Sequence, residues 1–347
     1  MLNSLSLQNF RSYKKSSFEF DRSTIIIGPN TSGKSNLIES IFLLSNGKSF
    51  RAEKDFQMVN FGHEMGRVKG RVSDIDLEVV VTVGEVAGVK SQFKRFFVNG
   101  VAKRRVDFVG NLTSVLFSPQ DLEIIVGSPG LRRNFLDNVL EQTDRDYRLA
   151  LLGFTKSLRQ RNALLEQARD SGRRNEKEFD YWDSLVIRNG SVLTRKREEF
   201  VEYLNESNKD ILNFRIEYDK SIISVERLLM YRNAENASGV TLVGPHRDDL
   251  LVFFDKYKEL KFFGSSGQQR LGVLQLKLLE LEYLRSKTEE EPLLLLDDVF
   301  SELDERHINL ILNIRDNQQT IITTTHEEFI PAKIKKSMKV IELSSQI

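Results

Sequence analysis

One eight-residue segment restricts the possible folds of this chain more than any other feature. Residues 28–35 read Gly-Pro-Asn-Thr-Ser-Gly-Lys-Ser, which fits the pattern G-x-x-x-x-G-K-[ST]. A β-branched run precedes it at Ser23 to Ile27, and a helical pattern follows from Lys34 to Leu44. A strand, a glycine-rich turn and a helix in this order form a phosphate-binding loop, because backbone N–H groups and the positive end of the helix meet at the turn. The segment therefore predicts an α/β fold that binds a nucleotide at the loop.

The loop motif assigns chemistry to most of its residues. Lys34 is expected to reach the β- and γ-phosphates, and the hydroxyl of Ser35 is expected to coordinate Mg²⁺. The chain contains no N-K-x-D element that would read guanine, so the motif favours ATP over GTP. The predicted nucleotide contacts in and beside the loop are Gly28, Asn30, Thr31, Ser32, Gly33, Lys34, Ser35 and Asn36.

An apolar run late in the chain predicts the second half of such a site. Leu293 to Leu296 has the pattern of a buried parallel strand and leads directly into Asp297 and Asp298. Ligands of parallel sheets bind at the carboxyl ends of the strands, which is where these two acids fall. We expect Asp297 to hold Mg²⁺, mostly through water, and Asp298 to act as general base or to position the attacking water.

A third segment, residues 265–270 with the sequence Ser-Ser-Gly-Gln-Gln-Arg, stands directly before a predicted helix. A small, hydroxyl-bearing helix start is a further anion site. One ATP does not need two such helix starts from one subunit, so this one is interpreted as a contact to the ATP of a partner subunit. A simple helix cap explains the same residues, and that alternative stays open.

The middle of the chain changes from strands to helices. Residues from about 66 to 117 have the pattern of antiparallel strands, with Asn99-Gly100 as a hairpin turn. From Leu131 to about Glu206 the pattern is helical, with heptad spacing that is interrupted at Arg161. The predicted domains are an ATPase head at 1–118 and 207–347, formed by both ends of the chain, and an inserted helical arm, a short antiparallel coiled coil, at 119–206. A plain helical bundle explains nearly the same pattern, and that alternative stays open.

Composition limits the kind of partner. The net charge is only +1, so any contact with DNA needs a local basic patch. The basic clusters are Arg67, Lys69 and Arg71; Lys94 and Arg95; Lys103 to Arg105; Arg132 and Arg133; Arg173 and Arg174; and Arg195 to Arg197. Taken alone, each cluster is best explained as a solvated face balanced by nearby acids. No pattern selects the clusters that would face DNA, and Lys103 to Arg105 and Arg132-Arg133 are put forward without one. The absence of cysteine and of any apolar run of membrane-spanning length favours a cytoplasmic protein without disulfides.

Together these motifs resemble the RecF family of the ABC- and SMC-type ATPases. Residues 265–270 resemble the signature motif of that superfamily, Ser301 to Asp304 its D-loop, and His326 its switch histidine. The segments that resemble the RecF family lie at residues 9–12, 47–51, 118–122, 127–137, 161–165 and 244–250. Three positions depart from the usual family pattern: Ser35 in place of threonine, Gln120 in place of glutamate, and Val126 in place of a basic residue.

The resemblance implies an ABC-type head that dimerises head to tail on ATP, with Ser265 of one subunit contacting the γ-phosphate held by the other. It implies catalytic roles for Lys34, Asp298, Ser265 and His326, and Mg²⁺ at Ser35 and Asp297. The further nucleotide contacts that it implies are Arg11, Ser265, Gly267, Gln268 and Asp304. Arg11 has an alternative role as a cap on the first sheet. The implied partners are duplex DNA and gap junctions, RecR, and RecO and RecA in a pathway of recombinational repair and replication restart.

Asp298 also bears on the rate of hydrolysis. Most ABC ATPases have the longer glutamate at this position, so the resemblance predicts a weak, DNA-stimulated ATPase with a turnover well below ~10 s⁻¹. Loss of the γ-phosphate contact would then loosen the dimer. The alternatives are an SMC-type mechanical ATPase, for which the predicted arm is short, and a scaffold that ATP merely stabilises.

Overall fold

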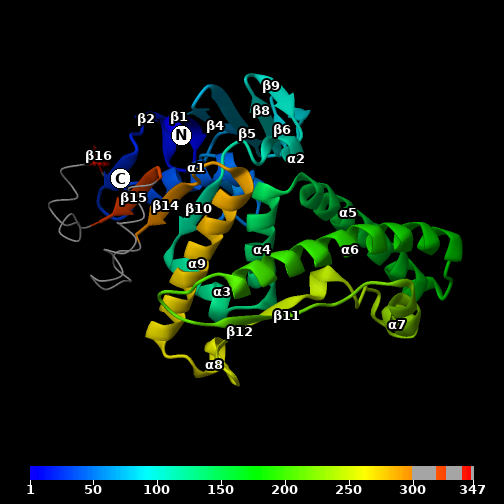
Figure 1. Cartoon of the computed structure of the whole chain (residues 1–347). Helices are drawn as coiled ribbons and strands as arrows, with labels where there is room; N and C mark the ends of the chain where they lie inside the picture. Colours follow the sequence, from blue (N-terminus) through cyan, green and yellow to red (C-terminus); the bar gives the residue numbers. More distant parts are fainter. Residues whose placement is uncertain (299–317, 326–337, 345–347) are drawn as a thin grey trace. The chain divides into compact units, whose positions relative to one another are not determined.

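The computed structural model describes residues 1–298, 318–325 and 338–344. The chain forms two compact units (Figure 1). The head unit comprises Met1–Asp121 and Glu280–Ile347, and the helical unit comprises Leu122–Leu279. Both ends of the chain therefore contribute to the unit that contains the predicted phosphate-binding loop.

A five-stranded parallel sheet forms one layer of the head unit. Its order is β10-β14-β15-β3-β16, and every neighbouring pair is parallel. The strands are β3 (Ser23–Ile27), β10 (Ser114–Phe117), β14 (Leu293–Asp297), β15 (Thr320–Thr324) and β16 (Lys339–Glu342). Strands β14 and β15 are buried along their whole length, which explains their unbroken runs of apolar and threonine side chains. The expected α/β fold with a parallel sheet is confirmed.

A six-stranded antiparallel sheet forms the other layer, in the order β2-β1-β4-β5-β8-β9. Its strands are β1 (Leu2–Phe10), β2 (Tyr13–Glu19), β4 (Met65–Val72), β5 (Ile75–Thr82), β8 (Lys94–Val98) and β9 (Val101–Lys103). Asn99 and Gly100 join β8 to β9 and both have positive φ, as the Asn-Gly hairpin signal predicts. A small hairpin, β6 (Glu85–Val86) and β7 (Val89–Lys90), follows β5.

Helix α1 (Lys34–Asn46) packs against strands of both sheets: β1, β4 and β5 on one side, and β10, β14 and β15 on the other. From Leu37 to Asn46 every residue is buried, which is typical of a helix that is enclosed by protein on all sides. The helix ends at Gly47, whose backbone has a φ of 65° and whose N–H donates to the Leu43 carbonyl at 2.9 Å. The start of the helix therefore lies at a fixed position beside the strand ends of the parallel sheet.

The helical unit is built on two long antiparallel helices, α5 (Arg145–Ser171) and α6 (Glu176–Glu206). Tyr147 contacts Arg197 and Arg161 contacts Asp183, so the residue numbers rise along one helix as they fall along the other. The remaining elements of this unit are α3 (Glu123–Val126), α4 (Pro129–Thr143), β11 (Arg215–Asp219), α7 (Val225–Ser238), η3 (Pro245–Arg247), β12 (Asp249–Asp255), β13 (Lys258–Glu259) and α8 (Leu260–Phe263). No helix among the described residues is both long and apolar enough to cross a membrane.

Short helices and one long helix complete the described part of the chain. The head unit also contains η1 (Asp55–Met58), α2 (Arg105–Phe108) and most of η2 (Pro119–Leu122). Helix α9 (Ser266–Thr288) begins in the helical unit and ends in the head unit. The structure thus groups residues 207–279 with the helical unit, whereas the sequence pattern predicted that they belong to the ATPase head. The division into a head at 1–118 and 207–347 and an arm at 119–206 stays a proposal.

Arg161, which interrupts the heptad pattern, is wholly buried in the helical unit. Its Nε donates to Asp183 Oδ1 at 2.6 Å, and its Nη2 donates to Glu235 Oε2 at 2.7 Å. Its Nη1 donates to the hydroxyl of Thr241 at 2.8 Å. Glu235 lies on α7 and Asp183 on α6, so one guanidinium joins three helices. The interruption marks a buried polar contact rather than a solvent-facing position.

Arg197 forms a second buried network. Its guanidinium donates to Asp248 Oδ2 and to Asp137 Oδ1, each at 2.8 Å. Asp248 also accepts the hydroxyl of Tyr218 and the backbone N–H of Ser221, and it is fully buried. The charged residues of the 244–250 segment thus brace the helical unit from within.

We expect Arg161→Met to lower the free energy of unfolding by about 3–5 kcal/mol, because it leaves the buried carboxylate of Glu235 without its partner. Arg195→Met on the neighbouring helix is the matched control. Arg195 is 66% exposed, and among the described residues its ion pair is with Glu199 at 3.8 Å, so its removal should change stability by no more than about 0.5 kcal/mol. Urea unfolding measures both, and equal changes would show that the Arg161 network contributes nothing specific.

Candidate functional site

The phosphate-binding loop connects β3 to α1 at the carboxyl edge of the parallel sheet. Its backbone turns sharply: Thr31 has a φ of 72° and Gly33 a φ of 98°. A Cβ atom at Gly28 would lie 2.7 Å from the carbonyl oxygen of Leu343 and 2.6 Å from the hydroxyl of Ser32, so only glycine fits there. Asn30 and Thr31, at the tip, are exposed. The loop has the tight curvature that lets backbone N–H groups surround an anion.

Lys34 points back into this loop. Its Nζ donates to the carbonyl oxygens of Gly28 and Pro29 at 2.7 and 2.9 Å, and the residue is only 7% exposed. Burial lowers the pKa of Lys34, and the nearby carboxylates of Asp298 and Asp297 oppose that shift. A cation is thus held inside the concave side of the loop, where phosphate oxygens of a bound nucleotide would lie.

Asp297 joins three segments of the head unit. The hydroxyl of Ser35 donates to its Oδ1 at 3.2 Å, and the hydroxyl of Thr323 donates to the same oxygen at 2.8 Å. Strand β15, which carries Thr323, lies between β14 and β3 in the sheet and so bridges the acid and the loop. Burial raises the pKa of Asp297, while the two hydroxyl hydrogen bonds lower it. The carboxylate and the Ser35 hydroxyl are hard oxygen ligands of the kind that Mg²⁺ takes.

Asp298 follows at the end of β14 with a φ of 53°, an uncommon conformation for a residue other than glycine. Its backbone N–H lies 3.1 Å from the hydroxyl and 3.3 Å from the carbonyl oxygen of Thr323. The residue is half-buried. Strand β15 therefore fixes the backbone of both acids, and Asp298 is placed directly beside Asp297.

These residues fit a Mg²⁺–nucleoside triphosphate. The hydroxyl of Ser32 is buried and has no hydrogen-bond partner within the described ranges, which costs about 1–3 kcal/mol unless a ligand oxygen pairs with it. No group of three or more His, Cys, Asp or Glu side chains within those ranges is placed to hold a metal ion alone. Mg²⁺ commonly uses one or two protein oxygens together with substrate phosphates, and Ser35 and Asp297 supply such a pair. The bound ion would neutralise phosphate charge during transfer to water.

Ser265 caps helix α9 in the helical unit. Its hydroxyl accepts the backbone N–H of Gln268 at 3.2 Å, and the Gln268 side chain accepts the backbone N–H of Ser265 at 2.9 Å. This reciprocal pair is a capping box. Ser265 and Gly267 are exposed, and Gln268 is partly buried. Ser265 therefore serves as the N-cap of α9, and this helix start is exposed to solvent.

Two other predicted contacts are occupied within the protein. Arg11 has a φ of 50°, and its guanidinium pairs with the buried carboxylate of Glu39 at 2.6 Å and donates to the Gln57 carbonyl at 2.8 Å. Asn36 donates to the hydroxyl of Ser12 at 2.9 Å and accepts from Arg51 at 3.1 Å. Both hydrogen-bond networks fasten α1 to neighbouring segments. Ser301, Asp304 and His326 lie outside the described residues.

The structure adds three residues to the site. The hydroxyl of Thr323 donates to Asp297, and the hydroxyl of Tyr13 donates to the Gly33 carbonyl at 3.1 Å. Arg51 donates to Asn36, and its positive charge lowers the pKa of Asp297. Arg51 ends the segment at 47–51, and Tyr13 directly follows the segment at 9–12, so the resemblance offered a signal for both. Thr323 had none, because it stands in a run of three threonines.

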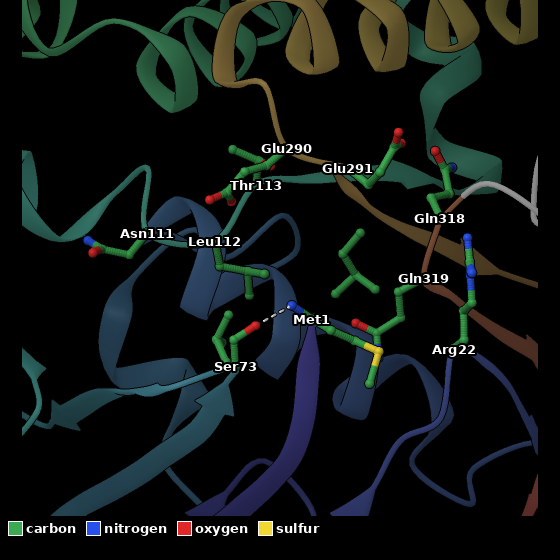
Figure 2. Close-up of a pocket in the computed structure, with 12 residues that line it drawn as sticks. Met1, Arg22, Ser73, Asn111, Leu112, Thr113, Glu290, Glu291, Gln318 and Gln319 are labelled. Atoms are coloured by element: carbon green, nitrogen blue, oxygen red, sulfur yellow. Dashed lines mark hydrogen bonds between the residues drawn. The ribbon is translucent and has the colours of Figure 1, made fainter.

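A second hollow in the head unit lies away from this site. It has a volume of about 390 Å³ and is lined by Arg22, Thr113, Leu293 and Gln319, among others (Figure 2). These four residues stand at or just before the amino ends of β3, β10, β14 and β15. Ligands of parallel sheets bind at the opposite, carboxyl ends. The hollow in Figure 2 is therefore not part of the nucleotide site.

One of the two basic clusters expected at DNA is turned inward. Arg132 is 4% exposed, and its guanidinium makes two hydrogen bonds to the carboxylate of Asp249, at 2.6 and 3.0 Å. Arg133 donates to the Asp248 carbonyl at 2.7 Å. Arg132 is thus bound inside the protein, whereas Arg133 is half-buried, and the expected DNA contact of this cluster stays a prediction.

Comparisons with known proteins agree with the fold. The model of the RecF/RecN/SMC N terminal domain family matches residues 1–346. The DNA replication and repair protein RecF of Bacillus mycoides (strain KBAB4) is 34% identical over 369 positions, covering 98% of this chain and 96% of that protein. RecF of Bacillus cereus (strain AH820) is 33% identical over 372 positions, covering 99% and 97%.

Solved structures give the same result. The recombination mediator protein RecF-ATP in the RecFOR pathway has a TM-score of 0.86 at 33% identity, covering 95% of this chain and 93% of that one. The Smc head domain from Pyrococcus yayanosii has a TM-score of 0.52 at 13% identity and shares the fold alone. The fold and the loop define an ATPase head of the ABC and SMC superfamily. Within this superfamily the chain belongs to the RecF family.

We expect Lys34→Ala and Ser35→Ala to separate the phosphate contact from the metal contact. Removal of the lysine charge should weaken ATP binding about 10- to 100-fold with or without Mg²⁺, since a hydrogen bond to a charged group contributes about 1.5–3 kcal/mol. Removal of the Ser35 hydroxyl should weaken binding only when Mg²⁺ is present. Calorimetric titration with ATP, in Mg²⁺ and in EDTA, measures both. An equal effect of Ser35→Ala in EDTA would contradict its role as a metal ligand.

Proposed function

We propose that this protein is an ATP-dependent DNA-binding protein of recombinational repair and replication restart. It dimerises on ATP, binds duplex DNA and single-strand/double-strand junctions at gaps, and supports RecA loading together with RecR and RecO in the bacterial cytoplasm. The relatives named as DNA replication and repair proteins support this role, as does the likeness to a recombination mediator that carries ATP.

The observation that carries the proposal is the contact between Ser35 and Asp297. The two residues are 262 positions apart in the chain, yet a hydroxyl and a carboxylate meet at 3.2 Å beside a lysine that is already directed into the loop. A sheet that served only for stability would not need a buried acid at this point, because burying a carboxylate is unfavourable without a compensating partner. ATP with Mg²⁺ is the ligand class that uses all three groups.

The solvent-facing cap of α9 supports the proposed dimer. The start of α9 is formed by Ser265, Gly267 and Gln268. We propose that it contacts no phosphate of its own subunit's ATP, and that head-to-tail pairing brings it to the γ-phosphate bound by the partner subunit. The proposed roles of Asp304 in the D-loop and of His326 as a switch rest on the resemblance alone. Arg11 stays a proposed nucleotide contact, with a cap on the first sheet as its alternative role, and its guanidinium pairs with Glu39 of α1.

Hydrolysis is proposed to be slow and stimulated by DNA. Asp298 would position the attacking water, and its side chain is one methylene shorter than the glutamate of most relatives in the superfamily. Hydrolysis would remove the γ-phosphate to which Ser265 of the partner binds, and the dimer would then release DNA. ATP binding would thus hold the dimer closed on DNA, and ATP hydrolysis would release it.

We expect ATP, but not ADP, to produce dimers and to tighten binding to a fluorescent gapped duplex by about tenfold or more, which corresponds to about 1.4 kcal/mol. Lys34→Ala should abolish both effects. Fluorescence anisotropy measures the binding, and light scattering the mass. Nucleotide-independent binding by the wild-type protein would contradict an ATP-gated clamp, even if DNA binding itself is tight.

We expect Asp298→Asn to keep ATP and DNA bound longer than the wild type, because the substitution removes the carboxylate but retains a side chain that tolerates a positive φ. The lifetime of the complex on gapped DNA, measured after a chase of unlabelled DNA, should rise as hydrolysis falls. An unchanged lifetime with abolished hydrolysis would indicate a protein that ATP stabilises but does not gate.

A further inference from the structure

Basic residues that are separate in the sequence lie in one row on the antiparallel sheet of the head unit. Arg67 on β4 and Arg95 on β8 both stand opposite Val80 on β5, and Arg67 and Lys15 both stand opposite Gln8 on β1. Residues directly opposite each other on neighbouring strands point to the same face. The register therefore places Lys15, Arg67 and Arg95 on one face, across five strands.

The same face is rich in hydrogen-bond donors. On β2, β1 and β4 the register forms three rows: Lys15, Gln8 and Arg67; Ser17, Ser6 and Lys69; and Glu19, Ser4 and Arg71. Eight of these nine side chains can donate a hydrogen bond, and Glu19 is the one acid. The alternate residues of β4, namely Val68, Gly70 and Val72, are buried, and α1 packs on this strand. The donor rows thus occupy the outer face of the sheet, opposite the core.

The cations of this face are held only loosely. Arg67 pairs with Glu78 at 3.0 Å, while Lys69 and Arg71 share Asp76 at 3.1 and 3.0 Å. The three side chains are 45–47% exposed, and exposed pairs of this kind contribute only about 0–1 kcal/mol. An incoming anion can therefore replace these carboxylates at little cost.

Arg95 forms no ion pair within the part of the chain that the structure describes. Its guanidinium lies 5.4 Å from the centre of the Phe97 ring. Arg67, Lys90 and Arg95 line a hollow of about 470 Å³ between the sheet and the β6–β7 hairpin, with Glu78 as its acid. At β8 the outer face thus borders a concave surface that carries three cations and one acid.

Other basic clusters of the head unit are engaged differently. Lys94 pairs with Asp55 at 2.9 Å and donates to the Gly47 carbonyl at 3.1 Å. Arg104 pairs with Asp107 at 2.9 Å, and Arg105 donates to the Asn46 carbonyl at 2.7 Å. The carbonyls of Gly47 and Asn46 thus hold Lys94 and Arg105 at the end of α1, whereas Arg104 is 67% exposed and its pair with Asp107 is a surface pair.

We propose that the outer face of the six-stranded sheet, with Arg67, Lys69, Arg71 and Arg95 as its main cations, binds the phosphates of duplex DNA. The inference rests on the proposed DNA binding and assigns a surface to it. Arginine, lysine, serine and glutamine are the side chains that contact phosphate and sugar without reading sequence. The donor rows on β2, β1 and β4 carry no aromatic side chain on which an unpaired base would stack. Phe97 on β8, which shares this face, lies under the Arg95 guanidinium, 5.4 Å from it, so the face suits a duplex backbone rather than single-stranded bases.

The test compares wild type with the triple variant Arg67→Ala/Lys69→Ala/Arg95→Ala. Binding to a blunt duplex of about 30 base pairs is measured by fluorescence anisotropy at several salt concentrations with ATP and Mg²⁺. If the three side chains bind phosphates, the slope of log affinity against log salt falls in magnitude by about 2–3, because each neutralised phosphate adds about 0.9 to that slope. Affinity at low salt should fall at least about tenfold, while ATP affinity and the thermal midpoint stay at wild-type values.

Two further variants make the result decisive. Lys156→Ala/Arg159→Ala/Arg188→Ala removes the same charge from exposed positions of α5 and α6, and it should keep the wild-type salt slope. Arg67→Lys/Arg71→Lys/Arg95→Lys retains the charge, and it should also keep that slope.

Each remaining outcome counts against a specific statement. A wild-type slope for the sheet variant, or an equal decrease in the α5–α6 variant, overturns the assigned surface and leaves the proposed DNA binding intact. No duplex or gapped-DNA binding by the wild type in any nucleotide state overturns the proposed function, and this inference with it.

Discussion

The enclosure of helix α1 between two sheets is the constraint on which the head unit depends. A helix that is buried on all sides cannot shift along its axis or rotate without opening voids on both flanks, because protein interiors are close-packed. Its first residue, Lys34, is therefore fixed relative to the strand ends of the parallel sheet. The same packing decides which face of the antiparallel sheet is apolar, and hence which face is left to carry Arg67, Lys69 and Arg71. The burial of α1 thus fixes the position of the phosphate-binding loop, and it also determines which face of the antiparallel sheet is polar.

The helical unit is specified by charge as well as by apolar packing. Arg161 and Arg197 are buried, and each is matched by two carboxylates from other segments. Such pairs add little net stability, because desolvation offsets much of the attraction. They do penalise every alternative register of α5 against α6, since a slip by one turn would leave a buried charge without its partner.

Local signals predicted most elements of the head unit correctly. The loop at 28–35, the Asn99-Gly100 turn and the apolar strand at 293–296 depend on short segments, whose chemistry is visible in the sequence. The placement of Thr323 beside Asp297, the burial of Arg132 and the row that joins Arg67 to Arg95 depend on strand register and on interactions between distant segments. No property of a single segment encodes those interactions. The sequence therefore predicted the parts of the nucleotide site, whereas its assembly, and the surface of the second sheet, needed the structure.

The left-handed backbone of Asp298 limits how this protein can change over evolutionary time. Aspartate and asparagine tolerate a φ near 53°, because their short side chains bond locally to the backbone, whereas longer side chains gain no such compensation. A mutation to glutamate would therefore meet a penalty of about 1 kcal/mol or more. The backbone conformation at Asp298 thus disfavours substitution by a longer side chain at this position.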